Sequence, residues 1–355
     1  MEPSREAVLE ALGRVIDPEL RRPVTELDMV RGVEVDGGRV ELTIVLTVAG
    51  CPLRSSFEDQ VAREVGTLDG VDEVTLSFEV MTPDERERLT TKLRGGIEVR
   101  KGLSLAASTR VVAVCSGKGG VGKSTLTANL AAALARRGLA TGVLDADVYG
   151  FSIPRILGIH QRPVVVDKMI VPPVRDELKL MSIGFFIDDN QPIMWRGPML
   201  HRALEQFLQD VHWGELDILV VDMPPGTGDV AISLGQLLPR AEVLVVTTPQ
   251  PAAQEVAARA GVMAQKTGMR LIGTVENMSG DVFGTGGGEA LAQELGVAYL
   301  GAIPLDARLR RSADDGEPLV WSEPDSDAAR AIFAVADRVE TMRPPQLLKQ
   351  LSVVS

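Results

Sequence analysis

The chain has 355 residues, 45% of them hydrophobic and 24% charged, and its formal net charge at pH 7 is −12. These values are ordinary for a globular protein and exclude disorder, a collagen-like repeat and a coiled coil as its main state. Its apolar runs are far shorter than the ~20 residues that span a bilayer, and the N-terminus lacks the basic start and apolar core of a signal peptide. We therefore expect a cytoplasmic protein of two domains, at ~150 residues per domain.

Residues 1–83 predict a small α+β domain. From the N-cap Ser4 onward, apolar residues recur at the spacing of a helix. The β-branched alternation from Val40 to Val48 is typical of a strand. The expected elements are a helix over 4–15, a strand over 40–48, a helix over 53–65 and a strand over 74–80.

Residues 84–109 differ in composition from the segments on either side. They are rich in Lys and Arg, contain Gly95-Gly96 and show no sustained apolar period. Such a stretch favours an interdomain linker with one or two helical turns.

Residues 110–355 alternate between apolar strands and helices. Near-continuous apolar runs are typical of parallel strands that are covered on both faces. We therefore expect an α/β domain with a doubly wound, mostly parallel sheet. The expected strands are 110–115, 140–145, 217–222, 242–248 and 270–276, the helices are 123–137, 198–212, 251–267 and 325–340, and residues 162–174 are an inserted hairpin.

A glycine-rich motif lies between the first of these strands and the first helix. The run from Gly117 to Ser124, GKGGVGKS, matches the spacing G-x-x-x-x-G-K-[ST] of a phosphate-binding loop. Glycines let backbone N–H groups turn toward phosphates, and the helix N-terminus adds positive potential. Lys123 is expected to reach the β- and γ-phosphates and Ser124 to hold Mg²⁺, so the bland alternative of an empty glycine-rich turn is disfavoured. The expected nucleotide contacts are Gly117, Lys118, Gly119, Gly120, Val121, Gly122, Lys123, Ser124 and Thr125.

Acidic side chains follow two of the predicted strands. Asp222 ends the strand 217–222, where a carboxylate would hold Mg²⁺ together with Ser124. Asp145 and Asp147 follow the strand that comes after the loop helix. An aspartate after a strand is commonly a turn former, but beside a phosphate loop we favour a functional role.

The loop contains an additional lysine, Lys118, directly after its first glycine, and this residue supports a resemblance to a known class. GKGGVGKS is similar to the deviant Walker A loop of the ParA, MinD and nitrogenase-iron-protein class of ATPases. The resemblance implies an ATP-dependent homodimer in which Lys118 acts on the partner's phosphates and Asp147 orients the attacking water. It also implies that Asn277 reads the adenine edge, which suits an amide that both donates and accepts. Without the resemblance, Lys118 would be a solvated loop residue and Asn277 an ordinary end-of-strand residue.

A closer resemblance covers nearly the whole chain. Its segments are SGKGGVGKST (116–125), LDADVYGFSIPRILG (144–158), WRGPM (195–199), VVDMPPGTGD (220–229), VVTTPQ (245–250), VENMSG (275–280), FGTGGGEALAQELG (283–296) and GAIPLD (301–306). Together these resemble the Mrp/ApbC family of iron–sulfur cluster carrier ATPases. The N-terminal module, with DPEL (17–20) and TVAGCP (47–52), resembles the small iron–sulfur assembly domain often fused ahead of that ATPase.

The family resemblance implies a function. It implies a dimeric carrier that binds and hydrolyses ATP and transfers iron–sulfur clusters to apoproteins. The implied ligands are ATP, Mg²⁺ and a [4Fe–4S] cluster, and the implied partners are a second copy of the chain, apoprotein clients and assembly factors.

One feature of that family is missing from the chain. The family has C-x-x-C between VENMS and FG-x-GGG, where this chain has only Gly280-Asp281-Val282. Cluster ligation usually needs four thiolates, and the chain has two cysteines. Cys51, at a predicted strand-to-helix turn, is the candidate cluster ligand because a helix N-terminus favours a thiolate; the alternative is a packed cysteine. Cys115 is expected to be a small buried strand residue.

Two alternative functions therefore stay open. One is an ATP-switched adaptor in iron–sulfur assembly without a cluster of its own. The other is a ParA/MinD-like positioning ATPase that binds DNA or a membrane. The net charge of −12 argues against DNA, and the C-terminal PPQLLKQLSVVS is too short and too poor in lysine for a basic membrane helix. We therefore expect neither a nucleic acid nor a membrane as partner.

Overall fold

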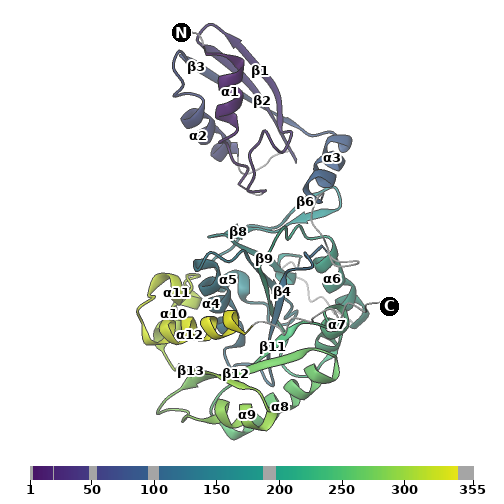
Figure 1. The fold of residues 1–355 in the computed structure, drawn as a ribbon, viewed down its shortest axis with the longest axis vertical. Helices are drawn as coiled ribbons and strands as arrows, with labels where there is room; N and C mark the ends of the chain where they lie inside the picture. The colour runs from purple at the N-terminus through teal and green to yellow at the C-terminus, as the bar shows by residue number, and fades with distance from the viewer. Residues whose placement is uncertain (1–2, 19, 48–53, 95–103, 187–196, 343–355) are drawn as a thin grey trace, which may run out of the picture. The chain divides into compact units, whose positions relative to one another are not determined.

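A computed structural model describes residues 3–18, 20–47, 54–94, 104–186 and 197–342 (Figure 1). The chain divides into two compact units. Unit 1 comprises Met1–Glu98, Pro163–Pro172 and Asp210–Gly214, and unit 2 comprises Val99–Arg162, Pro173–Gln209 and Glu215–Ser355. No helix in the described part of the chain combines the length and the apolarity that crossing a membrane requires.

Unit 1 is built on a three-stranded sheet in the order β1-β2-β3. The central strand β2 runs antiparallel to β1 and parallel to β3. Alternate residues of β2 are buried, as its β-branched alternation predicts, with Val40, Leu42 and Ile44 facing the core. The elements are α1 (Arg5–Leu12), β1 (Val30–Asp36), β2 (Arg39–Leu46), α2 (Arg54–Glu64), β3 (Glu73–Val80), α3 (Pro83–Arg94) and the hairpin β6 (Val164–Val166) with β7 (Met169–Val171).

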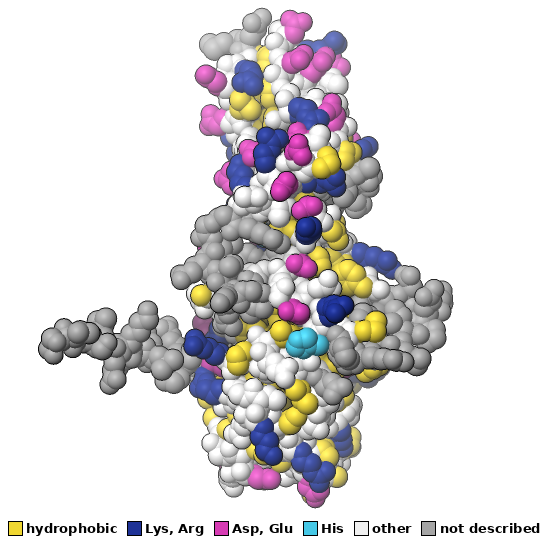
Figure 2. All heavy atoms as spheres, turned by 90° about the vertical axis from the view of Figure 1, so that its right-hand side faces the viewer, with side chains coloured by type: hydrophobic (Ala, Val, Ile, Leu, Met, Phe, Trp, Pro, Cys, Tyr) yellow, Lys and Arg dark blue, Asp and Glu magenta, His cyan; other side chains and the backbone are white. Residues whose placement is uncertain are grey.

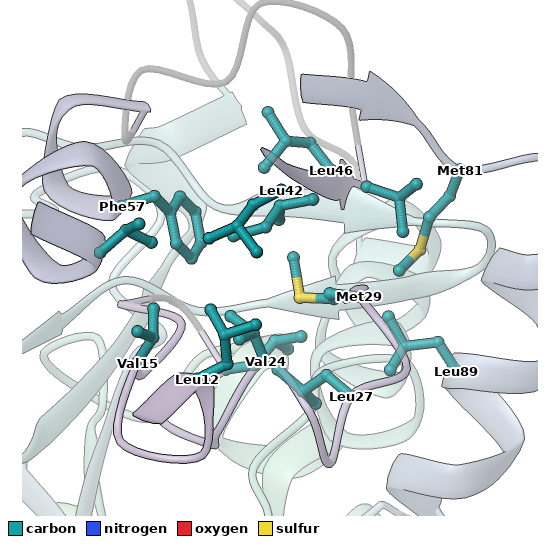
Figure 3. Close-up of a cluster of buried hydrophobic side chains, with 14 of the residues drawn as sticks. Leu12, Val15, Val24, Leu27, Met29, Leu42, Leu46, Phe57, Met81 and Leu89 are labelled. Carbon is teal, nitrogen blue, oxygen red and sulfur yellow. The ribbon is translucent and has the colours of Figure 1, made fainter. Parts of the chain in front are cut away.

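The core of unit 1 combines side chains from its sheet and its helices (Figure 3). Leu12 of α1, Leu42 of β2 and Phe57 of α2 are all nearly inaccessible to solvent. The same cluster includes Met169 of the β6–β7 hairpin. The expected hairpin insertion is therefore present, and its apolar residues group with unit 1 although they lie within the sequence of the second expected domain. Figure 2 shows acidic and basic side chains interspersed on the face of unit 1 that it presents.

Two elements of unit 1 differ from the sequence expectation. Helix α3 occupies three turns of the stretch interpreted as a linker, because Leu89 and Leu93 are buried at i, i+4 spacing. Its start is a capping box: Thr82 N–H donates to Glu85 at 2.7 Å, and Glu85 N–H donates to the Thr82 hydroxyl at 3.3 Å. Strand β1 was not expected because charged residues interrupt its apolar alternation.

Unit 2 confirms the predicted doubly wound α/β fold. Its eight-stranded sheet has the order β13-β12-β11-β4-β10-β5-β9-β8 and is parallel except for the β8–β9 pair. The strands are β4 (Arg110–Ser116), β5 (Thr141–Asp145), β8 (Val174–Arg175), β9 (Leu178–Ser182), β10 (Ile218–Asp222), β11 (Glu242–Thr247), β12 (Arg270–Ser279) and β13 (Ala298–Pro304).

Helices cover both faces of this sheet (Figure 1). Helices α4 and α12 pack together on one face, and α6, α7 and α8 follow one another on the other. The helices are α4 (Lys123–Arg136), α5 (Ile153–Ile156), the 3₁₀ turn η1 (Ile183–Phe186), α6 (Gly197–Gln209), α7 (Asp229–Leu237), α8 (Pro251–Lys266), α9 (Gly287–Leu295), α10 (Ala307–Asp314), α11 (Leu319–Ser322) and α12 (Asp327–Thr341).

The strand order determines where the site lies. Strand β4 lies between β10 and β11, so the chain connections leave it in opposite directions. In such sheets the crevice at the carboxyl ends of the strands is the usual ligand site. The segments after β4, β5, β10 and β12 therefore meet at one edge, and these are the segments that carry the predicted functional residues.

Candidate functional site

The glycine-rich loop follows β4 directly and leads into α4, as the motif predicts. Gly120 and Gly122 both have φ of +80°, in the left-handed region that favours glycine. A Cβ atom on Gly122 would overlap the amide nitrogen of Asn277, and one on Gly117 would overlap the backbone of Val256. The loop is thus tightly enclosed by neighbouring elements, which accept only glycine at these positions.

A cavity of about 670 Å³ opens in front of this loop. Its lining includes Lys118, Lys123 and Ser124 from the loop region, Asp147 and Tyr149 from the segment after β5, and Pro224 from the segment after β10. The volume is within the range of small-molecule and cofactor sites. Backbone N–H groups at the start of α4 suit a phosphate-bearing ligand at this position.

Lys123 lies at the centre of a buried group of charges. Its Nζ is 2.8 Å from Asp222 Oδ2 and 3.7 Å from Asp147 Oδ2, with 6% of the Lys123 side chain and none of the Asp222 side chain exposed. The Ser124 hydroxyl donates to Asp222 Oδ2 at 2.6 Å. The structure therefore brings together the four side chains for which the sequence predicted phosphate, Mg²⁺ and water contacts.

The donor set at Ser124 and Asp222 fits Mg²⁺. A hydroxyl and a carboxylate are hard oxygen ligands, and Mg²⁺ usually combines one or two such protein ligands with water and phosphate oxygens. Among the described residues, no group of three or more His, Cys, Asp or Glu side chains is arranged to hold a metal ion. The oxygen pair at the loop is thus suited to a metal that brings its own phosphate ligands.

Asp145 and Asp222 end neighbouring strands in register with each other. Burial, reinforced by the Asp222 charge, raises the pKa of Asp145 to about 7. Burial also raises the pKa of Asp147, while the positive charge of Lys123 opposes that shift. The carboxylates thus depend on Lys123 for charge compensation.

The Asp145 carboxylate also organises the segment that follows β5. It accepts hydrogen bonds from Asp147 N at 3.2 Å, from Ile153 N at 3.3 Å and from the Ser182 hydroxyl at 3.0 Å. Asp147 Oδ1 in turn accepts from Gly150 N at 3.1 Å. These bonds hold Asp147 at the edge of the cavity.

Asn277 lies behind the loop at the end of β12. Its Nδ2 donates to Val121 O at 2.8 Å, and the side chain lines a second cavity of about 380 Å³. Thr125, Leu305 and Asp306 line this cavity as well. The residue predicted to contact adenine therefore borders a cavity next to the phosphate loop, with its amide nitrogen bonded to that loop.

The remaining predicted residues have different surroundings. The Lys118 side chain is exposed on the loop. Cys51 lies outside the described residues. Cys115 is 2% exposed, and burial raises the pKa of its thiol to about 12, so it is a buried strand residue as predicted.

Sequence reasoning missed two polar residues at the site. The Thr127 hydroxyl lies 2.8 Å from Asp222 Oδ1. Glu276 is buried at the end of β12 and accepts from Gly288 N at 2.8 Å, at the start of α9. The available signal for Thr127 was its spacing, three residues after Ser124 on the loop helix. The available signal for Glu276 was the run of glycines at 286–288.

Two family models match the chain. Residues 107–340 match the model described as NUBPL iron-transfer P-loop NTPase. Residues 5–76 match the model described as iron–sulfur cluster assembly protein. The two matches correspond to the ATPase-like and small N-terminal parts of the sequence.

Known proteins resemble the chain in sequence and in structure. A protein of Mycobacterium bovis named iron-sulfur cluster carrier protein is 51% identical over 357 residues, covering 95% of this chain and 93% of its own length. An Archaeoglobus fulgidus nucleotide-binding protein, solved in complex with ADP, is 35% identical with a TM-score of 0.53, covering 62% of this chain and 90% of its own. The cell division ATPase MinD of Pyrococcus furiosus shares the fold, at 24% identity and a TM-score of 0.53, over 66% of this chain and 99% of its own.

Proposed function

This chain belongs to the NUBPL iron-transfer P-loop NTPase family, and on that premise we propose that it is an ATP-hydrolysing homodimer that carries iron–sulfur clusters to apoproteins. The observation that carries the proposal is the buried group of Lys123, Ser124, Asp147 and Asp222 around the glycine-rich loop. The 51% identity to an iron–sulfur cluster carrier protein over nearly the whole chain supports the cargo.

Each residue of the site has a role in this proposal. The N–H groups of the loop from Gly117 to Thr125 and the ammonium of Lys123 bind the phosphates of ATP. Ser124 and Asp222 hold Mg²⁺, which compensates phosphate charge. Asp147 orients the attacking water, and Asn277 contacts the adenine.

Lys118 has its role in the dimer. Its side chain is exposed and lines the 670 Å³ cavity, and we propose that it contacts the phosphates bound by a second copy of the chain. In this proposal two copies close around ATP, and hydrolysis of the ATP opens the dimer again.

The cluster is the cargo, and cysteine number restricts how it is held. One chain has two cysteines, fewer than the four thiolates that a cluster usually needs. Cys115 is buried beneath the loop with a thiol held protonated by its surroundings. We therefore propose Cys51 of each copy as the protein ligands, with further ligands from a small thiol or a client protein.

Anaerobic reconstitution of the full chain with iron, sulfide and a small thiol tests this proposal. We expect Mg²⁺-dependent ATP hydrolysis, a thiolate-to-iron charge-transfer absorption, and transfer of that absorption to an apo-acceptor protein. Cys51→Ala should abolish the absorption, whereas Cys115→Ala, the matched control, should keep it. ATP hydrolysis without any cluster under every nucleotide condition would exclude the carrier function.

The burial of Cys115 favours one second candidate, the adaptor without its own cluster. An adaptor would bind apo-clients in an ATP-dependent way while no cluster forms. Pull-down of an apo-acceptor with ATP, with ADP and without nucleotide, combined with assay of the acceptor for a cluster, separates the two functions. ATP-dependent capture without cluster transfer indicates the adaptor, whereas transfer that Cys51→Ala abolishes indicates the carrier.

A further inference from the structure

The two oxygens of the Asp222 carboxylate have different partners. Oδ2 lies 2.6 Å from the Ser124 hydroxyl and 2.8 Å from Lys123 Nζ. Oδ1 lies 2.8 Å from the Thr127 hydroxyl. Lys123 and Ser124 belong to the phosphate-loop motif, whereas Thr127 lies beyond it on α4.

Helix geometry explains why both hydroxyls reach the same carboxylate. Ser124 and Thr127 are three residues apart on α4, so their side chains lie on one face of the helix. That face is directed at the end of β10, where Asp222 is completely buried. Thr127 is also completely buried, so its hydroxyl has no access to bulk water.

We propose that Thr127 is a positioning residue that holds the Asp222 carboxylate in place while the partners of its other oxygen change. The proposal rests on the proposed function, in which Ser124 moves to Mg²⁺ and Lys123 to phosphate. Both changes remove a partner from Oδ2 and leave it available to water molecules of the metal shell. The Thr127 bond to Oδ1 fixes the direction in which Oδ2 then points.

A competing explanation for Thr127 is an ordinary helical contact. Its hydroxyl also lies 2.9 Å from Lys123 O, the carbonyl four residues earlier, which many helical threonines contact. One hydroxyl proton serves one acceptor at a time, and a carboxylate is the stronger acceptor. The two explanations differ in their consequence: only the bond to Asp222 links Thr127 to Mg²⁺.

Binding of a fluorescent ATP analogue, titrated with Mg²⁺, tests the proposal in the full chain. Thr127→Val removes the hydroxyl at nearly constant volume, and we expect it to raise the half-saturating Mg²⁺ concentration about 10-fold, the effect of one charge-assisted hydrogen bond. Affinity for the analogue in excess chelator should change less than about twofold. Thr127→Ser, which keeps the hydroxyl, should restore the wild-type Mg²⁺ dependence. If Thr127→Val does not fold, as judged by thermal unfolding, Thr127→Ala takes its place.

A second variant distinguishes the two acceptors. In an Asp222→Ala background, which removes both acceptor oxygens, Thr127→Val should cause no further rise in the half-saturating Mg²⁺ concentration. An equal rise in both backgrounds, or an unchanged Mg²⁺ dependence of Thr127→Val, would overturn the positioning role. A wild-type chain that binds the analogue without any Mg²⁺ dependence would overturn the proposed function as well, so the two failures are distinguishable.

Discussion

Lys123 and Asp222 form a buried ion pair, with 2.8 Å between the ammonium nitrogen and Oδ2 of the carboxylate. Asp147 Oδ2 lies 3.7 Å from the same ammonium nitrogen. A single lysine thus compensates two carboxylates, and it is also the residue proposed to bind phosphate. Changes at Lys123 should therefore affect binding and stability together.

We expect Lys123→Ala to weaken ATP binding by about 100-fold, because one charge-assisted contact with phosphate contributes roughly 3 kcal/mol. The variant should also unfold more readily at neutral pH, since it leaves the buried carboxylate of Asp222 without its cation. Calorimetric titration with ATP and thermal unfolding measure the two effects. Wild-type ATP affinity in this variant would contradict the assignment of the loop.

Gly122 is the glycine of the loop that combines a positive φ with a close approach to Asn277. Gly122→Ala places a Cβ against Asn277 and strains a residue with φ of +80°. Gly138→Ala is the matched control, because Gly138 has φ of +85° and nothing within 4 Å of a Cβ. Both variants should lose about 1 kcal/mol or more to backbone strain.

Only the loop variant should also lose ATP affinity, because only there does the added methyl group displace Asn277 and the loop carbonyl to which it is bonded. Unfolding by urea and ATP titration on the two variants separate these effects. Equal ATP affinity in Gly122→Ala and Gly138→Ala would show that the close approach to Asn277 has no role in binding.

The sequence was sufficient to predict most of unit 2, because its central strands are buried on both faces and read as continuous apolar runs. It was insufficient for α3, because apolar burial in this helix comes mainly from Leu89 and Leu93. The capping box of Thr82 and Glu85 stabilises the start of the helix. The hairpin was expected, but its place in the core of unit 1 was not, since apolar pattern alone does not say which core a segment joins.

The candidate site likewise contains residues that the sequence predicted and contacts that it did not. Lys123, Ser124 and Asp222 were predictable because motif spacing and strand ends bring them to one sheet edge. The Val121 bond of Asn277 and the Thr127 contact were not, because they depend on the distances between elements far apart in sequence.

Asp145 should give the protein a distinctive pH dependence. Its pKa is raised from an ordinary 3.8 to about 7, by burial first and then by the Asp222 charge. Between these values the native state keeps a proton that the unfolded chain has lost, so the free energy of unfolding falls as pH rises. The slope from this group is at most about 1.4 kcal/mol per pH unit.

Asp145→Asn stays neutral at every pH and should lack this slope. Relative to the wild type, the variant should become progressively more stable as pH rises toward about 7, and the difference should then level off. Urea unfolding of both proteins at about pH 5 and about pH 8 measures it. A stability difference that is the same at both pH values would show that Asp145 titrates normally.

Lys118 provides the test of the dimer. We expect Lys118→Ala to abolish ATP-dependent dimerisation while changing the ATP affinity of the monomer only slightly, because the exposed side chain lies outside the buried charge group. Light scattering of the chain with ATP, with ADP and without nucleotide measures the mass directly. Asp147→Asn, which should slow hydrolysis, provides a comparison protein in which Lys118 is present and the ATP-bound dimer persists for longer.

Lys266→Ala is the matched control for Lys118, since it removes another exposed lysine from the end of α8, outside the loop. If loss of a surface charge were enough to prevent association, the two variants would behave alike. If the lysine acts on the partner's phosphates, only Lys118→Ala should remain monomeric in ATP, and added salt should weaken the wild-type dimer through the same contact. An ATP-induced dimer of Lys118→Ala would exclude a role across the interface and leave Lys118 as a solvated loop residue.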